Sequence, residues 1–421
     1  MRRDLDRLML ERGLAGMVVF AYDRYSQAMH YVTGQKLHYG IYFRAPGADP
    51  ADPSSPAAGA RAHLIHDPME RDQAAAVGCD HSGFPQHGLA RIQTEEGGHP
   101  ARVFGRLIGE SCATLGIAGR IGLFGELPAG LAHALGQRLV EVNPALSVDS
   151  GHPDLMLQAR ATKDPDEIEA IRRVARGTVA AMGRLRDHLA SLRRDGEHFR
   201  DGGRGPVLLG DLRRVLQREF LEHGLLEDQG DSIVSQGRDA GVPHNRGDDE
   251  EPLAAGRALI VDIFPGEVGG GYHADMTRTF CMGPAPEPLA RLHAETHEAY
   301  RAASVALAPG RPCRAFQDVA CAVLERHGHA TRRTDEATQA GYVHNLGHGV
   351  GLSVHDPPLL GGPPTNAAQL EPGMVVTVEP GLYYPERGMG CRIEDLFLVR
   401  PDGTVENLTP FPFDLEIEPR G

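Results

Sequence analysis

The sequence has almost no lysine. Lysine occurs only at Lys36 and Lys163, although arginine is abundant, and the chain contains neither a GxxxxGKS nor a GxxxxGKT segment. P-loop chemistry needs the lysine of such a segment, and Schiff-base chemistry needs a lysine in a catalytic setting. Neither of the two lysines has such a setting. The sequence therefore argues against both reaction classes.

Long hydrophobic runs and an excess of positive charge are missing too. No apolar stretch approaches the roughly 18–20 residues that span a bilayer, and the N-terminal segment MRRDLDRLMLERGLAG carries charges where a signal peptide needs an apolar core. The net charge is −14, whereas nucleic acids and anionic membranes attract positive surfaces. We therefore expect a cytoplasmic protein with no nucleic-acid partner and no membrane partner.

The six cysteines are scattered, without a CxxC pair or a tight cluster. In a chain of 421 residues this pattern indicates reduced and mostly buried thiols rather than a disulfide framework. The length predicts two or three domains, because one domain usually has about 100–200 residues.

A change in the sequence pattern near residue 157 predicts a domain boundary. Residues 1–157 alternate helix-like and strand-like segments, such as the strand GMVVFAY, and predict an α/β domain. Asp164-Pro165 then begins a long amphipathic helix with acids in its first turn, where a helix favours negative charge. Farther along, short strands and turns are rich in His, Asp and Glu. We expect a second domain over residues 158–421.

Two predicted hairpins of the second domain carry acids within apolar strands. In ALIVDIFPGEVGGGYHADMTRTFCMG, Asp262 interrupts an apolar run and Asp275 lies on the strand that returns after a glycine-rich tip. In GMVVTVEPGLYYPERGMGCRIEDLFLV, Glu379 ends an apolar strand and Glu394 lies on the return strand. A buried carboxylate must be paired, hydrogen-bonded or metal-bound, or it takes up a proton. Four convergent carboxylates would repel one another unless cations neutralise them, and two divalent ions can do so.

Histidines lie between the two hairpins, in the segment HNLGHGVGLSVHDPP. This segment supplies His344, His348 and His355. One imidazole added to four carboxylates makes a mixed oxygen and nitrogen site that suits Mn²⁺, Co²⁺, Zn²⁺ or Fe²⁺. By contrast, His293-Ala-Glu-Thr-His297 lacks the glutamate position of a zinc-binding HExxH helix, so we interpret it as a solvated helix face.

Four stretches, in this order, resemble the pita-bread metallopeptidases, the group that includes prolidase, aminopeptidase P and methionine aminopeptidase: VDIFP…HADMTRTF, HNLGHGVGLSVHD, VEPGLYYP and RIEDLFLV. The first domain is similar to the creatinase-like, ribonuclease H-like α/β domain of prolidase and aminopeptidase P, which methionine aminopeptidases usually lack. The resemblance therefore implies the Xaa-Pro branch, with that N-terminal α/β domain followed by an α+β pita-bread catalytic domain. Members of this branch are often homodimers.

The resemblance also implies metal-binding roles by motif position. Asp262 would chelate one metal ion and His348 the other. Asp275 and Glu394 would bridge both ions, and Glu379 would bind the second ion while it accepts a proton. The implied cofactor is a pair of divalent ions, with Mn²⁺ expected and Co²⁺, Zn²⁺ or Fe²⁺ as alternatives.

The same resemblance implies how a short proline-containing peptide would be cleaved. A hydroxide held between the two ions would attack the scissile carbonyl. His355 and His244 would hold the carbonyl and the developing oxyanion, and Glu379 would pass the proton to the leaving nitrogen. Arg392, which precedes the last glutamate, would contact substrate or, more in keeping with its position, support groups of the active site.

One departure from the family pattern leaves the specificity open. Prolidases and aminopeptidases P commonly place an arginine that contacts the substrate between Gly349 and Val378, and this stretch contains none. A dipeptidase, an aminopeptidase and a carboxypeptidase-like use of the same metals all fit the sequence. A C–N hydrolase or lyase acting on a small metabolite would also keep the metals. A non-enzymatic pita-bread binding module would tend to lose ligands, and here all five are present.

Overall fold

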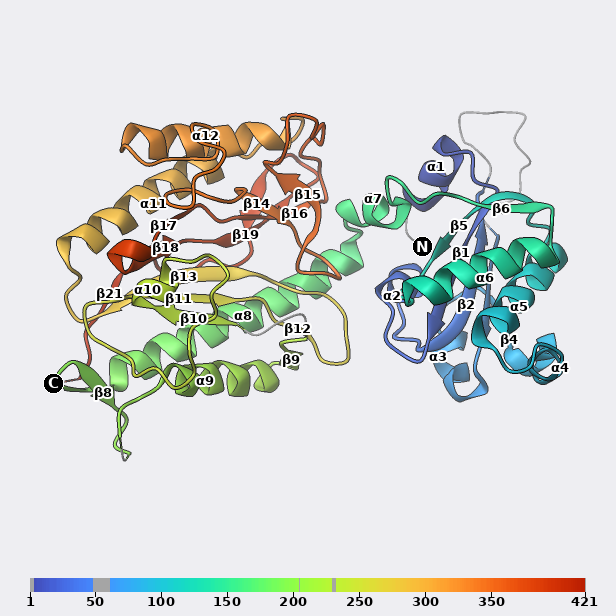
Figure 1. Ribbon diagram of the computed structural model, residues 1–421, viewed down its shortest axis with the longest axis horizontal. Coiled ribbons are helices and arrows are strands. Elements are labelled where there is room, and N and C mark those ends of the chain that lie inside the picture. The colour runs from blue at the N-terminus through green and yellow to red at the C-terminus, as the bar shows by residue number, and fades with distance from the viewer. Residues whose placement is uncertain (1–3, 48–60, 204, 229–231, 421) are drawn as a thin grey trace. The chain divides into compact units, whose positions relative to one another are not determined.

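The computed structural model describes residues 4–47, 61–203, 205–228 and 232–420. The chain divides into two compact units, residues 1–160 with 269–271 and residues 161–268 with 272–421 (Figure 1). All six cysteines are free and five of them are buried, as the sequence predicts. In the described part of the chain, no helix is both long enough and apolar enough to cross a membrane.

A six-stranded sheet forms the centre of the first unit, in the order β4-β3-β2-β1-β5-β6. Strand β1 pairs antiparallel with β2 and parallel with β5. The strands are β1 (Gly16–Tyr22), β2 (Tyr39–Ala45), β3 (Arg61–His66), β4 (Asp80–Gly83), β5 (Gly119–Phe124) and β6 (Leu146–Val148). The helices are α1 (Asp4–Glu11), α2 (Gln27–Thr33), η1 (Pro68–Glu70), α3 (Arg71–Ala75), η2 (Phe84–His87), α4 (Leu89–Glu95), α5 (Pro100–Thr114), α6 (Ala129–Val142) and α7 (Leu155–Ala161).

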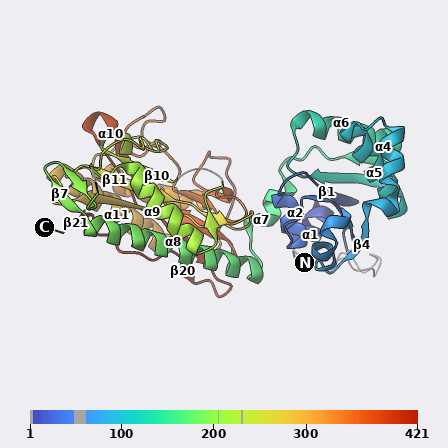
Figure 2. The same ribbon diagram turned by 90° about the horizontal axis from the view of Figure 1, so that it is seen from below.

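Helices cover both faces of this sheet. Figure 2 shows α5 and α6 on one side of the strands and α1 and α2 on the other. Every residue of β1 except the last is buried, because successive side chains point to opposite faces and both faces are covered. Phe104 and Leu107 of α5 belong to one apolar core with Val18 and Phe20 of β1. The first unit is thus a layered α/β structure.

The second unit is built on two larger sheets, β10-β11-β13-β21 and β15-β14-β16-β19-β20. Its strands are β7 (Arg193–Asp195), β8 (His198–Arg200), β9 (Leu225–Leu226), β10 (Ile233–Gln236), β11 (Ala258–Ile263), β12 (Gly266–Glu267), β13 (Met276–Met282), β14 (Gly347–Gly349), β15 (Asp356–Leu360), β16 (Val375–Val378), β17 (Gly381–Tyr384), β18 (Met389–Arg392), β19 (Asp395–Val399), β20 (Val405–Asn407) and β21 (Glu416–Ile417). Its helices are α8 (Pro165–Ser191), α9 (Leu209–Glu222), α10 (Gly237–Ala240), α11 (Glu287–Ala306), α12 (Cys313–Arg326) and η3 (Pro385–Arg387).

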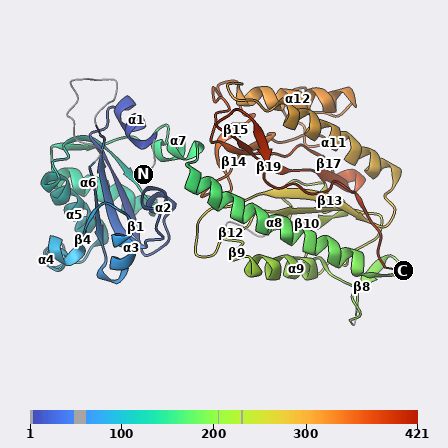
Figure 3. The ribbon, with the colours of Figure 1, turned by 180° about the vertical axis from the view of Figure 1, so that it is seen from behind.

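Two pairs of helices enclose these sheets. Figure 3 shows α8 and α9 on one side of the strands and α11 and α12 on the other. Helix α8 begins where the sequence predicts, because Asp164 and Glu167 form a capping box that satisfies the first backbone N–H groups. Tyr300 of α11 and Phe316 of α12 share one core with Val376 of β16. The strands that carry the candidate acids are therefore fixed by packing from the helices.

A backbone bridge joins the two hairpins. Strand β11 pairs with β13 so that Asp262 lies opposite Thr277, and β16 pairs with β19 so that Val378 lies opposite Asp395. Thr277 and Glu394 then form an antiparallel bridge, in which the Glu394 N–H donates to the Thr277 carbonyl at 3.1 Å. The bridge brings together residues that are 117 positions apart in the chain, and with them the acids of both hairpins.

The prediction for the two histidines of α11 is wrong, because they do not form a solvated face. His293 is only 9% exposed, and the ring centre of His297 lies 4.6 Å from that of Phe413. Burial is the main cause that lowers the pKa of His293 to about 4, so this imidazole is neutral at physiological pH. Both rings serve packing, and in the described residues they do not join a metal-binding group.

Candidate metal centre

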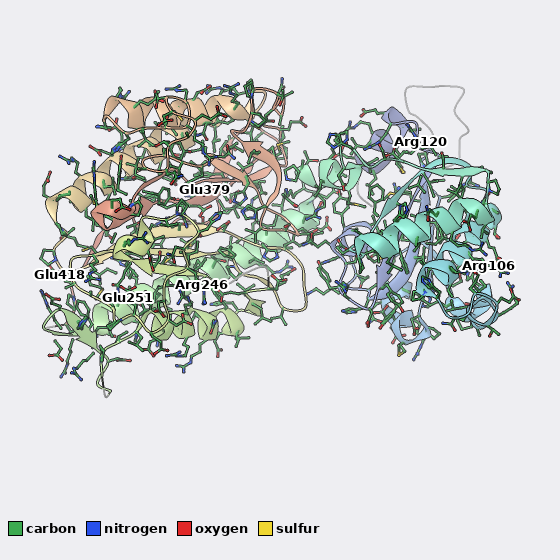
Figure 4. The ribbon with its side chains drawn as sticks, in the orientation of Figure 1. Arg106, Arg120, Arg246, Glu251, Glu379 and Glu418 are labelled. Carbon is green, nitrogen blue, oxygen red and sulfur yellow. The ribbon has the colours of Figure 1, made fainter. Side chains whose placement is uncertain are left out.

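The ends of paired strands position all four acids. Asp262 lies near the end of β11 and Asp275 directly before β13, while Glu379 directly follows β16 and Glu394 directly precedes β19. Asp275 and Glu394 thus lie one residue outside the return strands on which the sequence places them. Figure 4 shows Glu379 among the strands rather than on a helix. Each hairpin therefore presents two acids, one from each of its two paired strands.

Asp275, His348 and Glu394 form a buried group that is suited to a metal ion. One ligand atom of each residue lies within 4.8 Å of the others. His348 Nε2 also lies 3.4 Å from Glu379 Oε1 and 3.7 Å from Asp275 Oδ2. The glycines on either side of His348 are required, because a Cβ at either one would collide with a backbone carbonyl oxygen.

Two buried carboxylate oxygens, one in this group and one on Asp262, have no hydrogen-bond donor among the described residues. Asp262 Oδ1 and Asp275 Oδ1 lie out of contact with solvent and without a partner among the described residues. Such an oxygen normally costs free energy, because it has lost its water and gained nothing. Carboxylate oxygens with one imidazole nitrogen are ligands that divalent cations prefer. The residues present therefore fit a divalent metal ion.

The electrostatics of the group agree with this fit. Burial, followed by the negative charge of Asp262, raises the pKa of Glu394 to about 8. Burial and then Glu394 raise the pKa values of Asp275 and Glu379 well above their usual range. Burial also lowers the pKa of His348 to about 3, with His355 as the second cause. The imidazole is thus neutral and able to coordinate, whereas the acids need added positive charge to remain ionised together.

Arg392 supplies the cation that faces Asp262. Its Nη2 donates to Asp262 Oδ2 at 2.5 Å, and its Nη1 donates to Tyr383 Oη at 2.8 Å and to the Pro243 carbonyl at 3.1 Å. The side chain is buried, at 3% exposure. These contacts favour the supporting role for Arg392 over a contact with substrate.

Three further histidines lie around the group. His355 and His244 are exposed, and the ring centre of His355 lies 4.3 Å from that of His348. The surrounding protein still removes enough water from His355 to lower its pKa, with His244 as the second cause. His344 Nδ1 donates to the Asn345 carbonyl at 2.7 Å, so its Nε2 accepts from the Tyr383 hydroxyl at 2.9 Å.

Sequence reasoning missed the polar residues that brace the site. The Thr277 hydroxyl donates to Glu394 Oε2 at 2.7 Å. Arg278 donates to the Glu394 carbonyl at 2.7 Å and pairs with the fully buried Asp395 at 2.7 Å. Tyr383, also fully buried, connects Arg392 to His344. The available signal was the presence of charged and hydroxyl residues close to two of the site acids, in MTRTF after Asp275 and in RIED around Glu394.

Comparisons with known proteins show what the chain is similar to. The profile of metallopeptidase family M24 matches residues 169–401. The probable dipeptidase PepE of Mycobacterium tuberculosis is 30% identical over 365 residues, which cover 86% of this chain and 84% of that protein. The Xaa-Pro dipeptidase of Pyrococcus furiosus is 30% identical over 173 residues, which cover 41% of this chain and 45% of that protein.

A solved structure is similar along the whole chain. The Xaa-Pro dipeptidase from Bacillus anthracis matches with a TM-score of 0.74 and 23% identity, covering 99% of each chain. A likeness at this identity shows the fold alone. It confirms the predicted combination of an N-terminal α/β domain with a pita-bread domain.

Proposed function

The chain belongs to metallopeptidase family M24, and from this premise we propose that it hydrolyses the Xaa-Pro bond of short peptides. The observation that carries the proposal is the buried group of Asp275, His348 and Glu394, whose ligand atoms lie within 4.8 Å of one another. The orphaned oxygens of Asp262 and Asp275 add to it. The names of relatives, dipeptidase and Xaa-Pro dipeptidase, support the substrate class.

We propose that two divalent ions bind five residues of the second unit. The proposed ligands are Asp262, Asp275, His348, Glu379 and Glu394. When bound, such ions polarise a peptide carbonyl and lower the pKa of a coordinated water. Their positive charge would also let the crowded carboxylates remain ionised. Arg392 would hold Asp262 in place through the contact between its Nη2 and Asp262 Oδ2.

Glu379 would move the proton. Its side chain is 17% exposed, which is more than that of Asp275 or Glu394, so one oxygen can face the substrate. As an ionised carboxylate beside the bound ions, Glu379 would take a proton from the attacking water. The proline nitrogen carries no hydrogen within the peptide bond, and it needs a proton in order to leave. Glu379 would deliver the proton there.

His355 and His244 would bind the carbonyl oxygen of the scissile bond. An imidazole ring can donate an N–H group, and both side chains are exposed. The ring of His355 lies beside that of His348, and His244 is close enough to His355 to lower its pKa. A donor placed at this oxygen gains strength as negative charge develops on it, so it stabilises the transition state more than the substrate.

A peptide panel tests the proposal. Xaa-Pro dipeptides, Xaa-Pro-Yaa tripeptides and peptides with either terminus blocked would be incubated with the Mn²⁺-loaded protein, and the products would be identified by mass spectrometry. We expect cleavage at the Xaa-Pro bond and its loss after chelation. Absence of cleavage of every peptide by the metal-loaded protein would remove the proposal. Cleavage from the other end would replace it with a carboxypeptidase-like function.

The proposal extends to the native ion, the compartment, the oligomeric state and the domain boundaries. We propose Mn²⁺ as the native ion, since the mixed oxygen and nitrogen ligands accept it along with Co²⁺, Zn²⁺ and Fe²⁺. A cytoplasmic homodimer, with domains over residues 1–157 and 158–421, agrees with the family resemblance. Elemental analysis of the purified protein tests the ion, and analytical ultracentrifugation tests the dimer.

A further inference from the structure

We propose that His66 and His81 of the first unit form a further metal site, which binds one divalent cation such as Zn²⁺. His66 is the last residue of β3, and His81 lies within β4. The pair shares no residue with the five candidate ligands of the second unit. The inference therefore goes beyond the proposed peptidase activity and does not depend on it.

The pairing of two strands brings the imidazoles together. Strand β4 lies at one edge of the six-stranded sheet and pairs parallel with β3, so that His81 lies opposite Leu64. Since successive side chains of a strand point to opposite faces, His66 lies on the same face as Leu64 and His81. His66 Nε2 is 3.2 Å from His81 Nδ1, and the ring centres are 5.3 Å apart.

The backbone determines which nitrogen of His66 can bind a cation. His66 Nδ1 lies 2.8 Å from the carbonyl oxygen of Asp67. A carbonyl oxygen only accepts hydrogen bonds, so Nδ1 carries the proton and Nε2 presents its lone pair to His81. The His66 side chain is 4% exposed, and the surrounding protein holds the ring in this orientation. A metal-binding histidine commonly donates its other N–H group to a carbonyl in this way.

The distance between the two nitrogens suits a shared ion. A tetrahedral zinc ion binds nitrogen at about 2.0–2.1 Å, which places two such nitrogens roughly 3.3 Å apart. The observed separation of 3.2 Å is close to this value. Without a cation, His81 Nδ1 donates a hydrogen bond to His66 Nε2. When a cation binds, the proton of His81 moves to its Nε2, which can donate to water because His81 is exposed. Both imidazoles then stay neutral.

The ligand type selects the class of cation. Imidazole nitrogens suit Zn²⁺, Ni²⁺ and Cu²⁺, whereas Mn²⁺ and Mg²⁺ are better served by oxygen ligands. The exposed side of His81 lets water complete the coordination. The pair therefore differs in chemistry from the acid-rich centre of the second unit.

A second pair of histidines provides a comparison. His63 Nε2 and His87 Nε2 each lie 2.7 Å from the hydroxyl oxygen of Ser82, which follows His81 in β4 and points to the opposite face. The hydroxyl separates these two rings, whose centres are 6.2 Å apart. His63 and His87 thus hydrogen-bond to a shared hydroxyl, whereas His66 and His81 face each other directly.

Zinc counting on the full-length chain tests the proposal. Wild-type protein, His81→Ala, His81→Gln and His87→Ala would be dialysed against rising Zn²⁺ concentrations until binding is complete, and zinc per chain would be measured by elemental analysis. We expect both His81 variants to hold one zinc ion fewer per chain than the wild type, and His87→Ala to hold as many. The second unit is unchanged in all four proteins, so its zinc cancels in the comparison.

His81→Gln separates the metal site from the hydrogen bond. Its amide N–H can still donate to His66 Nε2, but the side chain has no imidazole with which to bind zinc. The Tm of each metal-free variant reports its folding, and saturation with Zn²⁺ should raise the Tm of the wild type more than that of His81→Gln. A His81→Gln protein that is folded and holds as much zinc as the wild type overturns the proposal. So does a zinc count that falls in His87→Ala but not in the His81 variants.

Discussion

Two buried glutamates, one in each unit, meet opposite surroundings. Glu96 is 6% exposed and accepts hydrogen bonds from Arg102 at 2.9 Å and Arg138 at 2.6 Å. These arginines, Arg102 first, lower its pKa to about 2. Glu394 is 2% exposed, but burial and then the charge of Asp262 raise its pKa to about 8. The same side chain is therefore held ionised in one unit and favours a proton in the other.

The difference separates a structural acid from a candidate metal ligand. Glu96 also pairs with Arg106, which is labelled in Figure 4, at 3.4 Å. Arginines of the protein therefore neutralise its charge. Glu394 faces other acids and has Thr277 as its hydrogen-bond donor. A group of acids that the protein does not neutralise needs cations from outside if it is to stay charged.

The largest effect is expected from Glu394→Gln. We expect kcat/KM for an Xaa-Pro dipeptide to fall at least about 1,000-fold, because loss of an outer partner of a ligand alone typically costs 10–100-fold and this change removes a charged ligand. Metal content, measured by elemental analysis after dialysis, should fall as well. Steady-state kinetics give the first quantity.

Glu96→Gln serves as the control for that experiment and should leave kcat/KM and metal content unchanged. The contrast between the two glutamates fails if Glu394→Gln keeps wild-type activity and its full metal content. It also fails if both variants lose activity to the same extent, since that result would indicate a general loss of folding.

A smaller loss is expected from His355→Ala. The variant should lose about 100–1,000-fold in kcat, the usual effect of removing one donor to a developing oxyanion, and it should keep its metal. His327→Ala is a matched control, because His327 is paired with Glu298 at 2.8 Å on α11, and it should keep wild-type kcat. Metal loss in His355→Ala would contradict the separation of substrate contacts from ligands.

Removing the metal should destabilise the protein by an amount that depends on pH. In the metal-free protein the folded-state pKa of Glu394 is raised from 4.5 to about 8. Its contribution to stability is therefore fully present below about pH 4.5 and is lost as the pH rises through about 8. Bound ions need ionised acids, so the metal-loaded protein escapes this loss. Calorimetry should show a higher Tm for the metal-loaded protein than for the metal-free protein. This difference should widen as the pH rises from 5 and reach about 8 °C at pH 8, as expected for an ion at about 1,000 times its Kd.

The matched sample for this measurement is metal-free Glu394→Gln, which has no acid at position 394 to titrate. It should lose less stability than metal-free wild-type protein as the pH rises. A Tm gap between loaded and metal-free wild-type protein that stays constant from pH 5 to pH 8 would show that crowded acids do not control metal binding.

The sequence predicts the candidate ligands but not the residues that hold them. Asp262 and Glu379 are recognisable because an acid within or at the end of an apolar strand is a local anomaly. The roles of Thr277 and Asp395 depend on the bridge between Thr277 and Glu394, and no local pattern sets the pairing of strands so far apart. Polar bracing of a site is therefore visible only in the folded chain.

The histidines of α11 show the same limit in a different way. His293 follows Leu289 by four positions and precedes Thr296 by three, and all three are buried, so the helical period did hold a signal for the buried face. His297 contacts Phe413, which lies near the end of the chain, and no local sequence pattern indicated this contact. A histidine can fill an apolar core once its water is excluded, which burial of His293 and its low pKa illustrate.

The smallest effect is expected from Glu96→Gln, measured as stability rather than activity. Because the folded-state pKa of Glu96 is lowered from 4.5 to about 2, its contribution to stability is present above about pH 4.5 and is lost as the pH falls through about 2. The variant should therefore unfold a few degrees below the wild type at pH 7, and the difference should shrink as the pH falls below 4.5. Glu141→Gln removes an exposed partner of the same Arg138 and should change Tm less, because water screens that pair. If the Tm difference between wild type and Glu96→Gln instead grows on acidification, the stability contribution of Glu96 has the pH dependence expected for Glu394. The contrast between the two units would then be lost.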